Sequence, residues 1–388
     1  TEEMNGSIRS YLFSNSLEKN KHDVIVLTSS RDESLSKVKV QKIGLRTIIV
    51  WIPVKYSNQM SFARRIVSFF LFFIKATFIS VKIKADLVFA TSTPLTIALP
   101  ALTFSYLKSK PFIFEVRDLW PEVPIAMGIL KNRLLIKSLR VFEKFIYQKA
   151  KVVIALSPDM KDGILKINPK TKVKVLPNMA STDLFLNINK KIPSPMDKLE
   201  GKKIVLYAGT FGLVNHLEYL VELAFIMQKT DVVFVFIGDG SEKEKIYQVA
   251  LNNGTYNNNL FILDPVPKNK IPAYFNCASV IISTTMPIEA LWKNSANKFF
   301  DAIAAKKPIV INNGGWLAKL IHDNDLGLVL PHDDIGSAAK ALESFLKNET
   351  RIKEVSRNCL DLASSDFSVN TICKSFVKTI ENLPYRNL

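Results

Sequence analysis

The stretch Met286–Trp316, MPIEALWKNSANKFFDAIAAKKPIVINNGGW, joins a loop, a helix, a strand and a glycine turn. Apolar residues recur at helical spacing from Asn297 onward, and Lys307-Pro308 ends the helix because proline cannot continue it. The strand that follows, Ile309–Ile311, is short and entirely apolar, which is typical of a strand in a buried sheet. A glycine turn then leads into the next helix. This order predicts one unit of an α/β domain.

Lys298 stands at the N-terminal end of that predicted helix. The first backbone N–H groups of a helix have no partner within it and favour an anion, whereas the helix dipole disfavours a lysine there. A phosphate between the lysine and the helix would account for both facts. Lys298 is therefore our candidate for the cation of a diphosphate, and Asp301, one turn later, could accept hydrogen bonds from ribose hydroxyls. The alternative is an ordinary i,i+3 surface pair.

Composition narrows the class of protein. The chain has 388 residues, enough for two domains, and a net charge of +17. Its mean hydropathy is +0.13. The basic residues are dispersed without an aromatic–basic repeat, so we expect phosphorylated ligands or anionic lipid and no nucleic acid. The three cysteines lie far apart without CxxC spacing, which fits a reducing cytosol. We expect neither a metal site nor a bound cofactor.

The chain alternates strands and helices twice, which predicts an α/β fold of two Rossmann-like halves with parallel sheets facing across a cleft. A helix over 12–20 precedes the strand Val24–Thr28, so the first strand of the N-terminal half is expected to be missing from this numbering. We predict an N-terminal domain over 1–186, a linker over 187–200, a C-terminal domain over 201–367 and a final helix over 368–388. In such sheets ligands bind at the carboxyl ends of the strands.

Several glycine-containing loops fall at predicted strand ends, where a backbone without side chains lets a phosphate approach closely. The predicted nucleotide-binding residues in these loops, including Arg9 as an additional cation, are Gly6, Arg9, Gly209, Thr210, Gly212, Gly238, Gly314 and Gly315.

The segment Glu115–Glu122, EVRDLWPE, crowds acidic, basic and aromatic groups together at another strand end, as recognition of a sugar requires. Asp118 is a candidate catalytic residue in this segment, with Arg117 beside it. Glu115, Trp120 and Glu122 are the predicted acceptor contacts. The alternative is a salt-bridged loop. Asp323-Asn324-Asp325 is a literal DxD, but it precedes a strand and is in the wrong place for a metal-bound nucleotide.

Residues 61–84 form an apolar stretch interrupted by basic residues, too interrupted for a transmembrane helix. It fits a helix that lies in a membrane interface, with cations meeting lipid phosphates. The alternative is a core helix of an α/β domain. The predicted membrane contacts are Arg64, Arg65, Phe69, Phe70, Phe72, Phe73 and Lys75.

Four runs, LYAGTFGLVNHLEYLVELA, FIGDG, NKFFDAIAAKKPIVINNGGW and LPNMASTDLF, together resemble glycosyltransferase family 4, the retaining group with the GT-B fold. FEVRDLWPE and NKFFD are similar to its branch of bacterial O-antigen and capsule transferases, including fucosaminyl transferases. The resemblance covers essentially the whole chain. It implies a C-terminal helix that returns to the N-terminal domain.

The resemblance further implies a metal-independent transferase with a nucleotide-sugar donor, UDP-linked, held mainly by the C-terminal half. The acceptor would be a polyprenyl-diphosphate-linked sugar, held by the N-terminal half at the cytoplasmic face of the plasma membrane. The moved sugar would be N-acetylated or deoxy.

The chain departs from the family pattern in its acidic motif. The second acid of the family's Glu-x7-Glu motif aligns with Asp301, but Lys293 occupies the first position, so Glu289 is the nearest substitute. The cations that relatives carry after the first C-terminal strand are absent, and Lys298, beside Asn297, is the predicted replacement. Lys319 stands where many relatives carry a glutamate.

Two other functions stay open at this stage. One is a GT-B-fold UDP-sugar epimerase, which needs no acceptor. The other is a non-catalytic basic protein that binds membranes, suggested by the net charge and residues 61–84.

Overall fold

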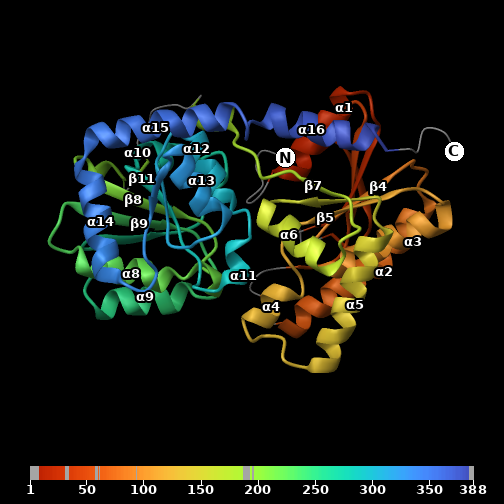
Figure 1. The fold of residues 1–388 in the computed structure, drawn as a ribbon, viewed down its shortest axis with the longest axis horizontal. Coiled ribbons are helices and arrows are strands. Elements are labelled where there is room, and N and C mark those ends of the chain that lie inside the picture. Colours follow the sequence, from red (N-terminus) through yellow and green to blue (C-terminus); the bar gives the residue numbers. More distant parts are fainter. Residues whose placement is uncertain are drawn as a thin grey trace. The chain divides into compact units, whose positions relative to one another are not determined.

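A computed structural model of the chain describes residues 8–30, 35–56, 60, 62–92, 94–186, 193–194 and 196–383. The predicted ligand residue Gly6 and half of the predicted linker, residues 187–192 and 195, therefore lie outside the described residues. The chain divides into two compact units, shown in Figure 1. We call Ser10–Pro177 with the segment from Cys373 onward the N-terminal unit, and Asn178–Ile372 with Arg9 the C-terminal unit.

The N-terminal unit contains two sheets. Strands β1 (Val24–Ser29), β3 (Thr47–Ile52) and β2 (Lys39–Lys42) form one in that order, with β1 parallel and β2 antiparallel to β3. Strands β4 (Val88–Thr91), β5 (Phe112–Val116), β6 (Val152–Ala155) and β7 (Val173–Val175) form a parallel sheet in chain order. The helices are α1 (Arg9–Lys19), α2 (Phe62–Lys82), α3 (Ala98–Lys108), α4 (Glu122–Ala126), α5 (Arg133–Lys149) and α6 (Pro158–Ile167).

The C-terminal unit is built on one parallel six-stranded sheet. Its strand order is β10 (Leu260–Leu263), β9 (Val232–Ile237), β8 (Lys203–Ala208), β11 (Val280–Ser283), β12 (Ile309–Ile311), β13 (Gly327–Val329). Counted from β8, this is the order 3-2-1-4-5-6 of a doubly wound nucleotide-binding fold. Its helices are α7 (Thr182–Leu186), α8 (Leu217–Ile226), α9 (Lys243–Asn252), α10 (Ile271–Cys277), α11 (Glu289–Trp292), α12 (Asn297–Ala304), α13 (Trp316–Asn324), α14 (Ile335–Lys347) and α15 (Glu349–Ser364).

Helices cover both faces of this sheet, and each face has its own core (Figure 1). Successive strand residues point to opposite faces, so Leu206 packs with α12 and α15, and its neighbour Tyr207 packs with α8. On the α12 face the ring of Phe300 lies 5.3 Å from that of Phe367 and 6.2 Å from that of Trp316. The predicted stretch 286–316 thus supplies part of the core of this unit, mainly through α12, β12 and Trp316.

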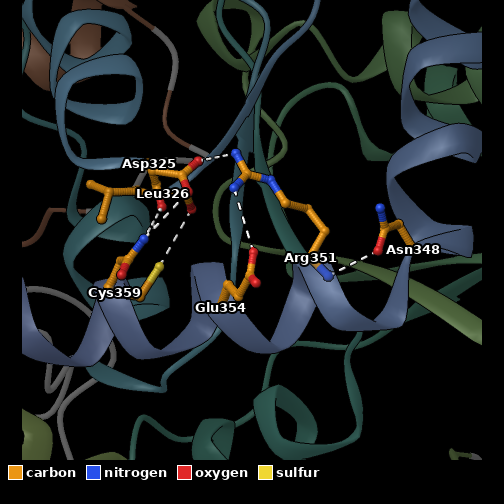
Figure 2. A network of polar contacts seen from close by, with 7 residues as sticks. Asp325, Leu326, Asn348, Arg351, Glu354 and Cys359 are labelled. Atoms are coloured by element: carbon orange, nitrogen blue, oxygen red, sulfur yellow. Dashed lines mark hydrogen bonds and ion pairs between the residues drawn. The ribbon is translucent and has the colours of Figure 1, made fainter.

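A polar network joins the end of α13 to α15, as Figure 2 shows. Asp325 takes a left-handed conformation, with a φ of 51°, and its carboxylate pairs with the guanidinium of Arg351. The Cys359 thiol donates to the carbonyl oxygen of Leu326 at 3.4 Å. Asp323 instead pairs with Lys319 at 2.8 Å. Both acids of the literal DxD therefore have structural partners.

The last helix, α16 (Val369–Glu381), links the two units. Its C-terminal part belongs to the N-terminal unit, where Phe376 stacks on Phe13 with 3.9 Å between ring centroids. The expected return of the C-terminal helix to the N-terminal domain is confirmed.

The boundary between the units lies at Pro177/Asn178, earlier than the predicted end of the N-terminal domain at 186. The physical reason is that α7 packs on the C-terminal unit. The ring of Phe185 lies 5.2 Å from that of Phe275, and the Ala180 amide donates to the Phe367 carbonyl at 2.8 Å.

Candidate functional site

The strand order of the C-terminal unit locates a candidate ligand site. The order reverses between β8 and β11, and in open parallel sheets ligands bind beyond the carboxyl ends of the strands at such a reversal. The loops that follow these two strands are tied together. Thr284 Oγ1 donates to the carbonyl of Asn215 at 2.6 Å, and the Met286 amide donates to the carbonyl of Val214 at 3.0 Å.

Lys298, the second residue of α12, reaches into the loop that follows β8. Its Nζ donates to Oδ1 of Asn215 at 3.1 Å and lies 4.7 Å from the ring centroid of Tyr207. Burial lowers its pKa to about 8, although the Asp301 carboxylate acts in the opposite direction. Among the described residues no carboxylate forms an ion pair with Lys298. A cation held without an anionic partner at a helix N-terminus favours an anionic ligand.

The backbone around Lys298 requires glycine at two positions. A Cβ added to Gly209 would lie 2.4 Å from Cε of Lys298. A Cβ added to Gly238 would lie 1.9 Å from the carbonyl oxygen of Gly209, closer than any real contact. The glycine that follows β9 thus lets the loop after β8 lie against it, and the glycine in that loop leaves room for the lysine. These are the predicted glycines of the donor site.

Side chains also brace the loop after β8. The Tyr207 hydroxyl donates to the carbonyl of Thr210 at 2.7 Å, and Asn215 Nδ2 donates to the same oxygen at 2.9 Å. Burial on all sides raises the pKa of Tyr207 far above its usual range, so the phenol stays protonated and keeps donating. Thr210 therefore contributes its backbone to a fixed loop, and Gly212 follows it as the residue before a short 3₁₀ turn, Leu213–Asn215.

Asp301 lies one turn after Lys298 on α12 but pairs with a different lysine. Its Oδ2 accepts a hydrogen bond from Nζ of Lys268, and both side chains are largely buried. Lys268 Nζ also lies 5.6 Å from the ring centroid of Phe185. The simple i,i+3 pair of Lys298 and Asp301 is therefore not formed, and the two residues have separate polar partners.

The other predicted donor residues of this unit lie along the loops before α12 and α13. Asn297 and Glu289 are exposed at the first positions of α12 and α11. Gly315 has a φ of +79°, a conformation that favours glycine, and it precedes α13. A Cβ on Gly314 would come within 3.1 Å of the Trp292 ring.

Sequence reasoning missed the residues that contact Lys298, namely Tyr207 and Asn215, and the partner of Asp301, Lys268. It also missed buried polar atoms near the β8 and β12 loops. Nδ1 of His216 and Nδ2 of Asn312 are buried without a hydrogen-bond partner. Burial lowers the pKa of His216, so its ring stays neutral near pH 7. The signal for Asn215, His216, Lys268 and Asn312 was their position in loops that follow strands, whereas Tyr207 lies within β8 itself.

The predicted acceptor residues in the N-terminal unit differ in their exposure to solvent. Glu115 is 1% exposed and accepts a hydrogen bond from Thr91 Oγ1 at 2.7 Å. Since β5 is buried on both faces, the Glu115 carboxylate braces β4 against β5, and its expected contact with an acceptor stays a prediction. The Arg117 amide donates to Ser92 Oγ at 3.0 Å, so the start of this loop is fixed.

Beyond that point the loop is more open. Arg117, Asp118 and Trp120 are half-buried, and Glu122 is exposed at the start of α4, where its carboxylate lies 4.0 Å from the guanidinium of Arg140. These four residues stay candidates for acceptor contact. Arg9, at the first position of α1, is 3% exposed, and its predicted role in donor binding stays a prediction.

Helix α2 has one buried face and one exposed apolar face. Phe72 packs on the cluster of Ile52, Val54 and Ala76, and Lys75 Nζ donates to the carbonyl of Pro53 at 2.9 Å. Phe69 faces Tyr56 with 5.3 Å between ring centroids. These three predicted membrane residues therefore hold the helix on its own unit.

The exposed face of α2 carries Phe70, 58% exposed, and four residues the prediction left out. Those residues are Ile66 at 51%, Val67 at 57%, Leu71 at 45% and Phe78 at 69%. Arg64 is exposed, whereas Arg65 and Phe73 are half-buried. Within the described chain no helix is both long and apolar enough to cross a bilayer. The described residues also contain no group of three or more His, Cys, Asp or Glu side chains placed to hold a metal ion.

Family comparisons agree with this architecture. Residues 8–184 match the family model Glycosyltransferase Family 4, and residues 189–359 match the model Glycosyl transferases group 1. Together the two matches span most of the chain, and the chain belongs to this family of glycosyltransferases.

Individual relatives are distant. The probable glycosyltransferase WbjE of Pseudomonas aeruginosa is 22% identical over 284 residues, which cover 71% of this chain and 69% of WbjE. Sucrose-phosphate synthase from Thermosynechococcus elongatus has a similar fold, with a TM-score of 0.75 at 15% identity over 97% of this chain and 93% of that chain. HepE from Anabaena, solved with UDP-glucose, gives a TM-score of 0.65 at 16% identity over 80% and 82%. The fold is therefore GT-B.

Proposed function

We propose that this glycosyltransferase moves a sugar, with retention of configuration, from a UDP-linked donor to a polyprenyl-diphosphate-linked acceptor during synthesis of a bacterial surface polysaccharide. The observation that carries the donor half of the proposal is the placement of Lys298. Its ammonium lies at the reversal of the strand order, against the loop after β8, without an ion-pair partner among the described residues. UDP-glucose bound to a GT-B relative agrees with a nucleotide donor.

In the proposed transfer the protein stabilises developing charge and does not itself supply a nucleophile. As the sugar–phosphate bond breaks, negative charge grows on the leaving diphosphate, and that diphosphate takes the acceptor proton on the same face of the sugar. Lys298 would neutralise the developing charge. Backbone N–H groups of the Gly209–Gly212 loop and at Gly314-Gly315 would donate hydrogen bonds to the diphosphate. Asp301 would accept hydrogen bonds from the ribose hydroxyls. No metal ion is required for this scheme.

For the acceptor we propose the open part of the EVRDLWPE segment. Asp118 would orient the attacking hydroxyl or support positive charge on the sugar ring, with Arg117, Trp120 and Glu122 as further contacts. The exposed apolar face of α2, with Phe70 and Phe78 at its centre, would hold the enzyme on the inner face of the plasma membrane, where such acceptors reside.

The test begins with the nucleotide. Thermal-shift measurements with UDP, GDP and ADP are expected to show stabilisation by UDP, and no response to any of the three would contradict the donor site. Incubation with UDP-sugars and short-chain polyprenyl-diphosphate acceptors should then yield a glycosylated lipid by mass spectrometry. Conversion of the UDP-sugar in the absence of any acceptor would instead indicate the epimerase.

A further inference from the structure

The N-terminal unit contains a cavity of about 610 Å³ that the proposed donor and acceptor chemistry does not explain. It lies between α5, the start of α4 and the end of α6. Its walls include aliphatic side chains such as Ile136, Val141 and Ile167. A cavity of this size can hold a group as large as a phosphate ester together with part of what it is attached to.

Among the charged residues that line this cavity, basic residues outnumber acidic ones. Five basic residues line it, Arg133, Lys137, Arg140, Lys144 and Lys166, against two carboxyl groups, Glu122 and Glu143. Arg140 is the cation that lies near Glu122. Within the part of the chain that the structure describes, the other four basic side chains form no ion pair. Four such charges around one cavity attract an anion to it.

Glu143 is the buried member of this group. It is 2% exposed, and the Tyr147 hydroxyl donates to its Oε1 at 2.8 Å. Burial raises its pKa to about 8, with Glu122 adding to the rise, while Tyr147 and Arg140 act in the opposite direction. The other charged groups that line the cavity with it are Arg133, Lys137 and Lys144 on the same helix and Lys166 on α6. Glu143 is thus largely protonated near pH 7, and the cavity is then more positive than its formal charges suggest.

The surface next to the cavity is apolar as well as basic. On α5 the side chains of Leu134, Val141 and Phe145 are 78%, 63% and 43% exposed. Helix α3, which contacts both α5 and α2, exposes Tyr106 and Leu107 at 85% and 57%. Exposed apolar residues interleaved with lysines along a helix are the pattern of a helix that lies at a membrane surface. A soluble phosphate would account for the cations but not for these residues.

We infer that the cavity between α5, α4 and α6 binds the headgroup phosphate of an anionic membrane phospholipid, while Leu134, Val141 and Phe145 enter the outer part of the bilayer. This site deepens the membrane part of the proposed function and rests on it. Its position on α5 gives the N-terminal unit a lipid contact in addition to α2. Loss of the Glu143 proton would add a negative charge inside the cavity and weaken the binding.

The test is vesicle flotation with the full chain, using phosphatidylglycerol mixed into phosphatidylcholine and, in parallel, phosphatidylcholine alone. The triple variant Lys137→Ala, Lys144→Ala, Lys166→Ala is expected to bind the anionic vesicles at least about tenfold more weakly. A matched control, Lys202→Ala, Lys229→Ala, Lys353→Ala, removes the same charge from exposed positions of the C-terminal unit. The control should bind nearly as well as the parent protein. Equal weakening in both triple variants would overturn the site.

A second variant separates the cavity from a merely charged surface. Binding of the parent protein to anionic vesicles should weaken as pH rises from 7 to 9, and Glu143→Gln should remove most of that change because its side chain cannot ionise. An identical pH dependence in the two proteins, or equal binding to neutral vesicles, contradicts the proposal. Stabilisation by UDP, measured on the same variants, reports on the donor site alone, so failure of the lipid site and failure of the proposed transfer remain distinguishable.

Discussion

The Nζ of Lys298 lies 3.1 Å from Oδ1 of Asn215, a residue 83 positions earlier in the chain. This contact joins the N-terminus of α12 to the loop after β8 across the reversal of the strand order. It also positions the ammonium over Tyr207 and against Gly209. Because the ammonium is already held in position, little free energy is needed to reorganise it when a diphosphate binds. Such preorganisation makes charge stabilisation effective.

Replacing Lys298 by alanine should lower turnover by about 10²–10³-fold, the usual cost of removing one group that stabilises developing charge. The measurement is single-turnover transfer from a UDP-sugar, with the melting temperature as a check of the fold. Lys319→Ala, at an exposed position on α13, is the matched control and should leave turnover near that of the parent. Near-normal transfer by Lys298→Ala would remove this residue from the mechanism.

The affinity for UDP should fall as pH rises through about 8. The pKa of Lys298 is lowered to about 8 by burial, so the free enzyme loses this charge above that pH, and a bound diphosphate would raise the pKa again. Calorimetric titration between pH 6.5 and 9.5 measures the change. Lys298→Arg keeps its charge throughout and should give a flatter profile. Parallel profiles for the two proteins would show that another group controls binding.

The sequence was sufficient to predict the α/β class and the two Rossmann-like halves, and it singled out Lys298 as a candidate site residue. A lysine at a helix N-terminus contradicts a local rule, and such contradictions often mark functional positions. The partners of Lys298 and Asp301 could not be predicted in the same way. Asn215 and Lys268 come from loops whose approach depends on tertiary packing, and loops have no periodicity from which contacts can be derived.

Glu115 and α2 show that the sequence alone did not predict which side chains point into the protein. An acid at a strand end can face a ligand or brace the next strand, and only the pairing of β4 with β5 shows that Glu115 does the latter. In α2 the apolar residues run almost all around the helix, so the sequence did not distinguish Phe72, which packs inward, from Phe78, which is exposed. Where apolar residues leave no polar face, periodicity does not determine orientation.

Gly238→Ala should destabilise the C-terminal unit by at least about 2 kcal/mol, because its new methyl group would overlap the carbonyl oxygen of Gly209, 1.9 Å away. Chemical denaturation measures the free energy of unfolding. Gly336→Ala is the control, since its Cβ would meet only Asp334 Oδ1, at 3.5 Å, and alanine favours the helix there. Equal stability of the two variants would mean that the loop after β8 moves without cost.

Asp325→Ala should lower the free energy of unfolding by about 1–2 kcal/mol, because it removes the partner of Arg351 and leaves alanine in a left-handed conformation. Both charged side chains are partly exposed, so we expect only a small share of this from the ion pair itself. Asp323→Ala removes a more exposed pair with Lys319 and should cost about 0.5 kcal/mol or less. A larger loss from Asp323→Ala than from Asp325→Ala would contradict the network shown in Figure 2.

The exposed face of α2 gives a prediction about membranes that does not depend on charge. Phe70→Ser combined with Phe78→Ser should weaken binding to phosphatidylglycerol-containing vesicles by about tenfold, since each ring buries apolar area only when a bilayer covers it. Folding should be unaffected because both rings are already exposed, 58% and 69%. The control, Phe225→Ser with Leu251→Ser, removes two similarly exposed residues from the C-terminal unit, 52% and 49%. If flotation is unchanged in the α2 variant, or weakened as much in the control, the exposed phenylalanines of α2 do not contact lipid.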